Sequence, residues 1–256
     1  KEMEDQLKQT FHLKEVFVSP NLVDDEEINL RDTCRALAGN LDKYIIDNTV
    51  VAVSWGNTLN CLAGQIQPLK AKDIKVVQLN GGVAKSASST GASQIVDALT
   101  MAGHGIGYMF PVPAIVDSKH TSEILQEETQ VKNVLRLAKE AEVSIFSIGA
   151  LSKDSILYEV EYLKDEDFQA LEKNKAVGDI ASRYFDINGN IALKELDDRV
   201  VGFGLEELRE KEWTIAIAVG VNKVDAIIGA LRAGFMNVLY TDEKTAREIL
   251  NRNLLG

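Results

Sequence analysis

Residues 50–58 read VVAVSWGNT, a short β-branched apolar run that passes through a glycine loop into the start of a helical pattern. The same order recurs along the chain, with further apolar runs at residues 74–79, 143–148, 214–219 and 238–240. Near-continuous apolar strands separated by helices are typical of parallel sheets that are covered on both faces. The sequence therefore predicts an α/β fold with a doubly wound, mostly parallel, Rossmann-like sheet.

The segments around this alternation predict the rest of the fold. Residues 1–15 and 24–46 carry apolar side chains at helical spacing, and a last helix is expected from Asp242 to about Asn251. Residues 150–210 interrupt the alternation of strands and helices. Within them Glu159–Lys175 is charged and helical, and an Asn188-Gly189 turn predicts a hairpin. We expect this stretch to form a small inserted lobe within one domain that spans residues 1–256.

Composition and charge restrict the functions that this segment can have. It carries 39 acidic against 28 basic residues, a formal net charge of −11, and no run of Lys or Arg. Such a chain repels nucleic acid, so we do not expect it to bind DNA by itself. It has no apolar run of the ~20 residues that span a bilayer and no signal peptide. Its two cysteines lie far apart in sequence, which predicts a reduced, cytoplasmic protein without a disulfide framework or thiolate metal site.

The loops after the predicted strands are the candidate site, because ligands of open parallel sheets bind at the carboxyl ends of the strands. Gly56-Asn57-Thr58 opens a helix, where backbone amides and a partial positive charge favour an anion, and Thr58 could either cap the helix or bind a phosphate oxygen. Asn80-Gly81-Gly82 permits close approach of a ligand to the backbone. Lys85, just beyond, could be solvated or could reach an aldehyde-bearing ligand.

Lys223 is the strongest single candidate for a ligand contact. It follows the loop Gly220-Val221-Asn222 in the first turn of a predicted helix. A cation there opposes the helix dipole by roughly 0.3–1 kcal/mol at an exposed site, so it fits better facing an anion than facing water.

Motifs for nucleotide cofactors and metals are not found. The glycines at residues 103–107 lack the spacing and the strand–helix order of the dinucleotide fingerprint, and the three histidines are scattered. The Asp186–Asn190 stretch lacks the closing glutamate of a calcium loop. We therefore expect no cofactor and no metal.

These loops resemble one known family. Gly56-Asn57-Thr58 looks like its phosphate loop, Asn80-Gly81-Gly82 looks like its second loop, and residues 218–243 are similar to its closing signature of a glycine loop, a lysine, AIIGALR and Thr-Asp-Glu. The family is the effector-binding domain of SorC-type sugar-responsive bacterial transcription regulators. The resemblance covers essentially the whole chain. The chain departs from it in having Gly220-Val221-Asn222 where the family has a glycine pair before the lysine.

The resemblance implies a fold related to ribose-5-phosphate isomerase and glucosamine-6-phosphate deaminase, and a regulator that assembles as a homodimer or homotetramer. It also implies an N-terminal helix-turn-helix domain that contacts operator DNA. The sequence begins at Lys1 without such a domain, and we expect it to be a piece of a longer protein. By resemblance, Gly56, Asn57 and Thr58 hold a phosphate beside Lys223. Gly81 and Gly82 border the sugar, and Asp179 meets its hydroxyls.

Three functions are compared on this basis. The favoured one is a non-enzymatic sensor that binds a sugar or sugar phosphate and changes the DNA affinity of a partner domain. The second is a sugar-phosphate isomerase or deaminase of the same fold, for which Asp97 or Asp179 would have to be the base. The third is an oligomerisation module with a vestigial pocket. The identity of the sugar, its phosphorylation and its role as inducer or co-repressor stay open.

Overall fold

The central sheet has seven strands in the order β1-β10-β9-β5-β2-β3-β4, and every pairing within it is parallel. The computed structural model describes residues 1–82 and 91–253. The strands of this sheet are β1 (Glu15–Ser19), β2 (Val50–Val53), β3 (Lys75–Gln78), β4 (Ile106–Tyr108), β5 (Val143–Ser147), β9 (Trp213–Ile217) and β10 (Val238–Asp242). The five apolar runs of the sequence form β2, β3, β5, β9 and β10, which confirms the predicted α/β fold.

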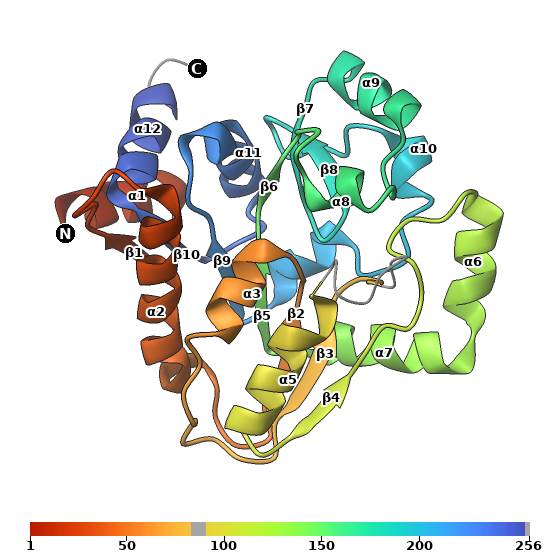
Figure 1. The fold of residues 1–256 in the computed structure, drawn as a ribbon, viewed down its shortest axis with the longest axis horizontal. Coiled ribbons are helices and arrows are strands. Elements are labelled where there is room, and N and C mark those ends of the chain that lie inside the picture. The colour runs from red at the N-terminus through yellow and green to blue at the C-terminus, as the bar shows by residue number, and fades with distance from the viewer. Residues whose placement is uncertain (83–90, 254–256) are drawn as a thin grey trace.

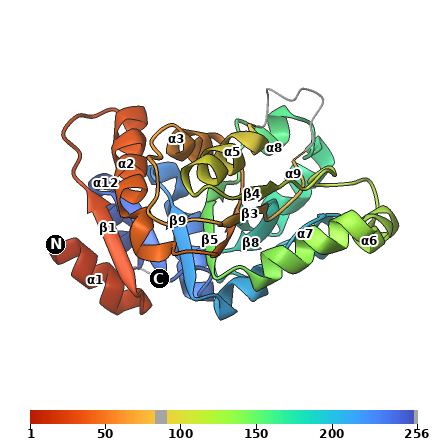
Figure 2. The ribbon, with the colours of Figure 1, turned by 90° about the horizontal axis from the view of Figure 1, so that it is seen from below.

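Helices cover both faces of the sheet (Figure 1). Those of the described residues are α1 (Glu2–Phe11), α2 (Glu26–Tyr44), α3 (Asn57–Ala63), α5 (Ala92–Ala102), α6 (Lys119–Glu127), α7 (Thr129–Glu140), α8 (Ile156–Glu159), α9 (Asp165–Lys173), α10 (Lys194–Asp197), η1 (Leu205–Glu210), η2 (Val221–Lys223), α11 (Val224–Ala233) and α12 (Glu243–Asn253). Figure 2 shows α2, α3 and α5 on one side of the sheet and α1 and α7 on the other. None of the helices in these residues is long and apolar enough to cross a membrane.

Alternating side chains of the central strands build two separate cores. Val51 and Val53 of β2 pack with α2, α3 and α5, whereas Ala52 between them belongs to the core on the opposite face. Strands that are buried on both faces lose the polar alternation of a half-exposed sheet, which is why the sequence shows continuous apolar runs. The long helix predicted at residues 24–46 is α2, which begins after Asp25, whose Oδ1 accepts the N–H of Ile28 at 3.0 Å.

The interruption at residues 150–210 forms the expected small lobe, which follows directly from the end of β5 (Figure 1). It contains a three-stranded antiparallel sheet of β6 (Gly149–Ala150), β7 (Ala176–Ile180) and β8 (Arg183–Asp186), in the order β6-β7-β8. The helix predicted at Glu159–Lys175 is α9, but it begins only at Asp165, and the short helix α8 ends at Glu159 before it. The chain reverses between them at Glu161, whose φ is 61°, so that Leu157 and Leu163 are both buried in the lobe core.

The lobe holds one predicted turn and one that the sequence analysis missed. Asn188-Gly189 does turn the chain, with Gly189 N–H bound to the Asp186 carbonyl at 2.9 Å, but only one bridge, between Phe185 and Ile191, follows it. The longer hairpin joins β7 to β8 through Ala181 and Ser182, whose φ angles are 50° and 70°. Positive φ at both turn residues suits a two-residue hairpin, yet neither residue is the usual Gly or Asn. That is why composition did not reveal this turn.

Candidate ligand-binding cavity

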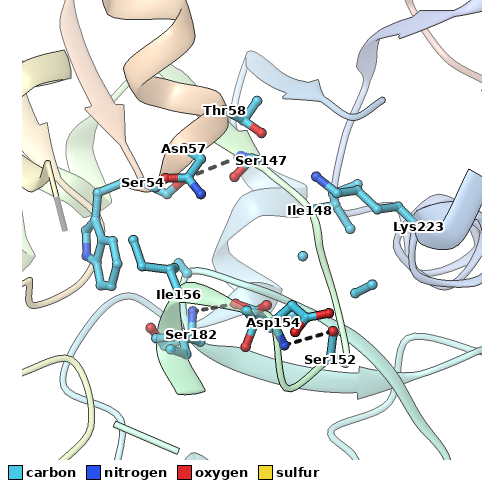
Figure 3. Close-up of a pocket in the computed structure, with 18 of the residues that line it drawn as sticks. Ser54, Asn57, Thr58, Ser147, Ile148, Ser152, Asp154, Ile156, Ser182 and Lys223 are labelled. Carbon is cyan, nitrogen blue, oxygen red and sulfur yellow. Dashed lines mark hydrogen bonds between the residues drawn. The ribbon is translucent and has the colours of Figure 1, made fainter. Parts of the chain in front are cut away.

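A cavity of about 260 Å³ lies between the carboxyl ends of β2 and β5 and the small lobe. Figure 3 shows it with the start of α3 on one wall, Lys223 projecting from the side, and lobe residues on the opposite wall. Its lining residues are Ser54, Trp55, Gly56, Asn57, Thr58, Asn80, Ser147, Ile148, Gly149, Ala150, Ser152, Asp154, Ser155, Ile156, Leu157, Asp179, Ala181, Ser182, Asn222 and Lys223. Six of the nine site residues predicted from sequence are among them: Gly56, Asn57, Thr58, Asn80, Asp179 and Lys223.

The start of α3 forms an electropositive wall. Gly56 precedes the helix with a φ of 132°, a backbone conformation that favours glycine, and no side chain caps the helix. Thr58 lies in the first turn and is buried, so it lines the cavity and is not the cap. The amides of a first helical turn have no partner within the helix, and the helix dipole adds partial positive charge. This wall can therefore accept an anion.

The two strand ends that carry this wall are tied together. The Ser147 N–H at the end of β5 donates to Ser54 Oγ at the end of β2, with an N···O distance of 3.4 Å (Figure 3). Both serines line the cavity. Their contact keeps the α3 loop in register with the strand that leads into the lobe.

Lys223 is a half-buried cation at the cavity. It ends η2 and occupies the position before α11. Burial lowers its pKa, and the negative charges of Glu26 and Asp179 oppose that shift. Within residues 1–82 and 91–253 the Lys223 ammonium makes no hydrogen bond and no ion pair. A charge taken out of water is costly unless it is paired, so an unpaired lysine in a cavity is a candidate ligand contact.

Asp179 lies on β7, on the lobe side of the cavity. Burial raises its pKa to about 6, while the backbone N–H of Ser182 and the charge of Lys223 act in the opposite direction. Asp179 Oδ2 accepts the Ser182 N–H at 3.1 Å, and Ser182 Oγ accepts Asn80 Nδ2–H at 2.9 Å. The Ala181-Ser182 turn therefore joins the β7 carboxylate to Asn80, two residues after the end of β3. The resulting wall carries oxygen acceptors and hydroxyl groups.

Two of the other predicted residues do not line the cavity. Gly81 and Gly82 are not among the lining residues: the Gly81 carbonyl accepts the Trp55 indole N–H at 2.8 Å. A Cβ on Gly81 would overlap the backbone carbonyls of Val112 and Pro113, so this glycine is required by close packing. Lys85 lies outside the described residues.

Several lining residues were not predicted. Ser152 and Asp154 belong to the loop after β6, and no site residue was predicted in this loop. Ser152 Oγ accepts the Asp154 N–H at 3.1 Å, which leaves the exposed Asp154 carboxylate at the cavity (Figure 3). Ser182 carried no sequence signal, because its position depends on an unusual turn.

Of the two carboxylates that the enzyme alternative offers as the base, the cavity contains one, Asp179. Asp97 lies on α5, is exposed and does not line the cavity. Asp179 remains as an acidic group, but no histidine is among the lining residues. In the described part of the chain no group of His, Cys, Asp and Glu side chains could hold a metal ion. The arrangement can bind an anion on one wall and hydroxyl groups on the other.

Comparison with known proteins gives consistent matches over nearly the whole chain. A family model described as "Putative sugar-binding domain" matches residues 1–251. The deoxyribonucleoside regulator of Bacillus subtilis (strain 168) is 33% identical over 220 residues, which are 86% of this chain and 70% of that protein.

Two solved structures extend the match to the fold. A DeoR family transcriptional regulator from Listeria monocytogenes superposes with a TM-score of 0.88 at 28% identity, over 97% of this chain and 98% of that one. The full-length sorbitol operon regulator SorC from Klebsiella pneumoniae has a TM-score of 0.89 over 97% of this chain and 80% of that one. Its identity is 24%, so that likeness is one of fold.

Proposed function

Because the chain belongs to the sugar-binding domain family of SorC-type transcription regulators, we propose that its cavity binds a monosaccharide phosphate. The bound sugar phosphate controls DNA binding by a separate N-terminal helix-turn-helix domain of the same protein. The family is regulatory, and the chain is a ligand-sensing domain and not an enzyme. The observation that carries the choice of ligand is the Lys223 ammonium, which has no partner among residues 1–82 and 91–253 and lies at the cavity that the first turn of α3 also lines.

The phosphate is assigned to the wall made by Gly56, Asn57 and Thr58, with Lys223 beside it. Backbone amides and a lysine ammonium are the usual donors to phosphate oxygens. The net charge of −11 opposes any anion at long range, so these local donors have to supply the attraction. Burial of Lys223 strengthens a direct contact, because the ammonium has already lost part of its hydration.

The sugar hydroxyls are assigned to the lobe wall. Asp179 and Asp154 offer carboxylate acceptors, Ser152 and Ser182 offer hydroxyls, and Asn80 is fixed by its bond to Ser182. At about 260 Å³ the cavity is small among ligand sites, which typically hold ~300–1,000 Å³, and it suits a single sugar ring better than an oligosaccharide. We assign no ligand contact to Gly81 and Gly82; Gly81 instead holds Trp55 through its carbonyl. Lys85 stays a proposed contact that rests on the resemblance alone.

We assign the effect of ligand binding on DNA affinity to a conformational change of the oligomer. An acidic domain cannot hold DNA, so the ligand acts by shifting an equilibrium between conformations of a cytoplasmic homodimer or homotetramer that carries the DNA-binding domains. The cavity lies between the main sheet and the small lobe, and a ligand that contacts both sides favours the conformation in which they are close.

The test is a thermal-shift screen with free and phosphorylated monosaccharides, followed by calorimetric titration of each ligand that stabilises the chain. Phosphorylated sugars should raise Tm, and Lys223→Ala should weaken their binding about 10- to 100-fold, as expected for a charged hydrogen bond worth ~1.5–3 kcal/mol. Lys132→Ala is the matched control, because Lys132 is an exposed lysine on α7 paired with Glu127. The proposal fails if no sugar phosphate stabilises the chain, or if Lys223→Ala binds as tightly as Lys132→Ala.

A further inference from the structure

The fold brings the two cysteines together behind the phosphate wall. Cys34 lies on α2 and is fully buried, and Cys61 lies in the last turns of α3 and is half-buried. These two helices pack against each other. Cys34 Sγ donates to the Thr58 carbonyl, with Sγ···O at 3.7 Å, and Thr58 lies one helical turn before Cys61 on α3. The two thiols therefore lie near enough for each to shift the pKa of the other.

The two thiols differ in reactivity. The hydrogen bond from Cys34 lowers the pKa of Cys61 to about 7 with help from Arg31, against the opposing effects of burial and Glu27. The same hydrogen bond and burial raise the pKa of Cys34, although the charge of Lys223 acts the other way. At pH 7 the partly accessible Cys61 is thus about half ionised, whereas the buried Cys34 stays a protonated thiol. This is the arrangement of an attacking and a resolving cysteine.

We propose that Cys34 and Cys61 form a redox-sensitive dithiol, which a peroxide closes to an intrachain disulfide that weakens ligand binding in the adjacent cavity. The Cys61 thiolate attacks one peroxide oxygen; the S–O bond forms, the O–O bond breaks, and the released hydroxide takes up a proton to give water. The Cys34 sulfur then attacks the sulfenic sulfur; the S–S bond forms, the S–O bond breaks, and the hydroxyl leaves as water with the Cys34 proton. Two thiols are oxidised by two electrons, and the peroxide is reduced to two waters.

The link to the cavity is α3 itself. Its first turn carries Asn57 and Thr58 on the cavity wall, and Cys61 follows one turn later. A disulfide removes the Cys34 proton that faces the Thr58 carbonyl and ties α3 to α2. We expect the first turn of α3 to shift away from the ligand. This second half of the proposal rests on the proposed function, whereas the thiol chemistry does not.

The thiol chemistry is measured on the whole chain without ligand. The reduced protein is treated with hydrogen peroxide, quenched with a maleimide and mapped by mass spectrometry, and iodoacetamide alkylation of Cys61 is followed against pH. Both thiols should disappear together into one intrachain disulfide, and alkylation should follow an ionisation near pH 7. At pH 7 Cys61 should react about fivefold faster than an ordinary thiol, since a ~50-fold gain in thiolate is offset by a ~10-fold loss of nucleophilicity.

Two variants separate the roles. Cys34→Ala removes the proton donor, so the alkylation midpoint of Cys61 should rise and peroxide should leave a sulfenic acid that dimedone traps. Cys61→Ala should leave the buried Cys34 thiol unreactive. Disulfides between two chains, independent loss of the two thiols, or a wild-type midpoint near 9 would each overturn the dithiol, and the wild-type results do not depend on whether either variant folds.

The coupling is measured with the sugar phosphate that most stabilises the reduced chain. Its Kd should rise severalfold after oxidation, return to the starting value with dithiothreitol, and stay unchanged in peroxide-treated Cys34→Ala. Equal affinity of the oxidised and reduced chains overturns the coupling. Absence of binding by the reduced chain as well overturns the coupling and the proposed function together, and the disulfide measurement shows separately whether the dithiol exists.

Discussion

Asp179→Asn should stabilise the unliganded domain at neutral pH while it removes a ligand contact. The carboxylate lies on the lobe wall of the cavity, where burial raises its pKa from the ordinary 3.8 to about 6. The folded state therefore binds the proton more tightly than the unfolded state does. The contribution of Asp179 to stability is therefore highest below pH 3.8, falls as the pH rises toward 6, and stays low above it. The rise from 3.8 to about 6 corresponds to ~3 kcal/mol of folding free energy, which wild type loses at pH 7.5.

Asparagine keeps the local structure that the carboxylate supports. Its side-chain oxygen can accept the Ser182 N–H that Asp179 Oδ2 accepts at 3.1 Å, and it carries no charge to desolvate. Urea unfolding at pH 7.5 should show the variant about 3 kcal/mol more stable than wild type, and at pH 3.5 the two should agree within ~0.5 kcal/mol. In thermal unfolding the gain corresponds to roughly 6–12 °C for a chain of this size.

The matched control is Asp154→Asn, which removes an exposed carboxylate from the same cavity. Its effect on stability should stay within ~0.5 kcal/mol at both pH values. Sugar-phosphate binding by Asp179→Asn should weaken, because the replaced group is proposed to accept sugar hydroxyls. The reasoning is refuted if Asp179→Asn gains no stability at pH 7.5, or gains the same amount at both pH values.

Three further substitutions probe the framework, each read by urea unfolding. Gly81→Ala should destabilise by at least about 2 kcal/mol, because the new methyl overlaps the Val112 carbonyl and the backbone has to move; unchanged stability would show that the loop is not tightly packed. Ala181→Gly should stabilise by about 1 kcal/mol, since it relieves a positive φ at the β7–β8 turn, and a loss would contradict the strain. Arg183→Met should cost about 3–5 kcal/mol, because it leaves the mostly buried Asp197 carboxylate, bound at 2.7 Å, without its partner; a neutral effect would mean that the pair is dispensable.

The strands and most of the phosphate wall could be predicted from the sequence, because both depend on local properties of the chain. A strand buried on both faces has to be apolar along its length, so the five central strands are visible as apolar runs. Gly56 stands where the backbone needs a positive φ, and a helix starts at the next residue. The residues that form the phosphate wall are therefore adjacent in sequence. Lys223 was identified by its conflict with a helix dipole, which is also a local feature.

The lobe wall and the thiol pair depend on tertiary structure, because their members are far apart in sequence. Ser182 reaches Asn80 from the two-residue turn Ala181-Ser182 between β7 and β8, in which both residues have positive φ. The shifted pKa of Asp179 arises from burial, which no sequence pattern encodes directly. Cys34 and Cys61 have no motif spacing, and only the packing of α2 on α3 makes them neighbours. Features that depend on a few neighbouring residues can be predicted from the sequence. The burial of side chains and the contacts between distant segments arise only when the chain has packed.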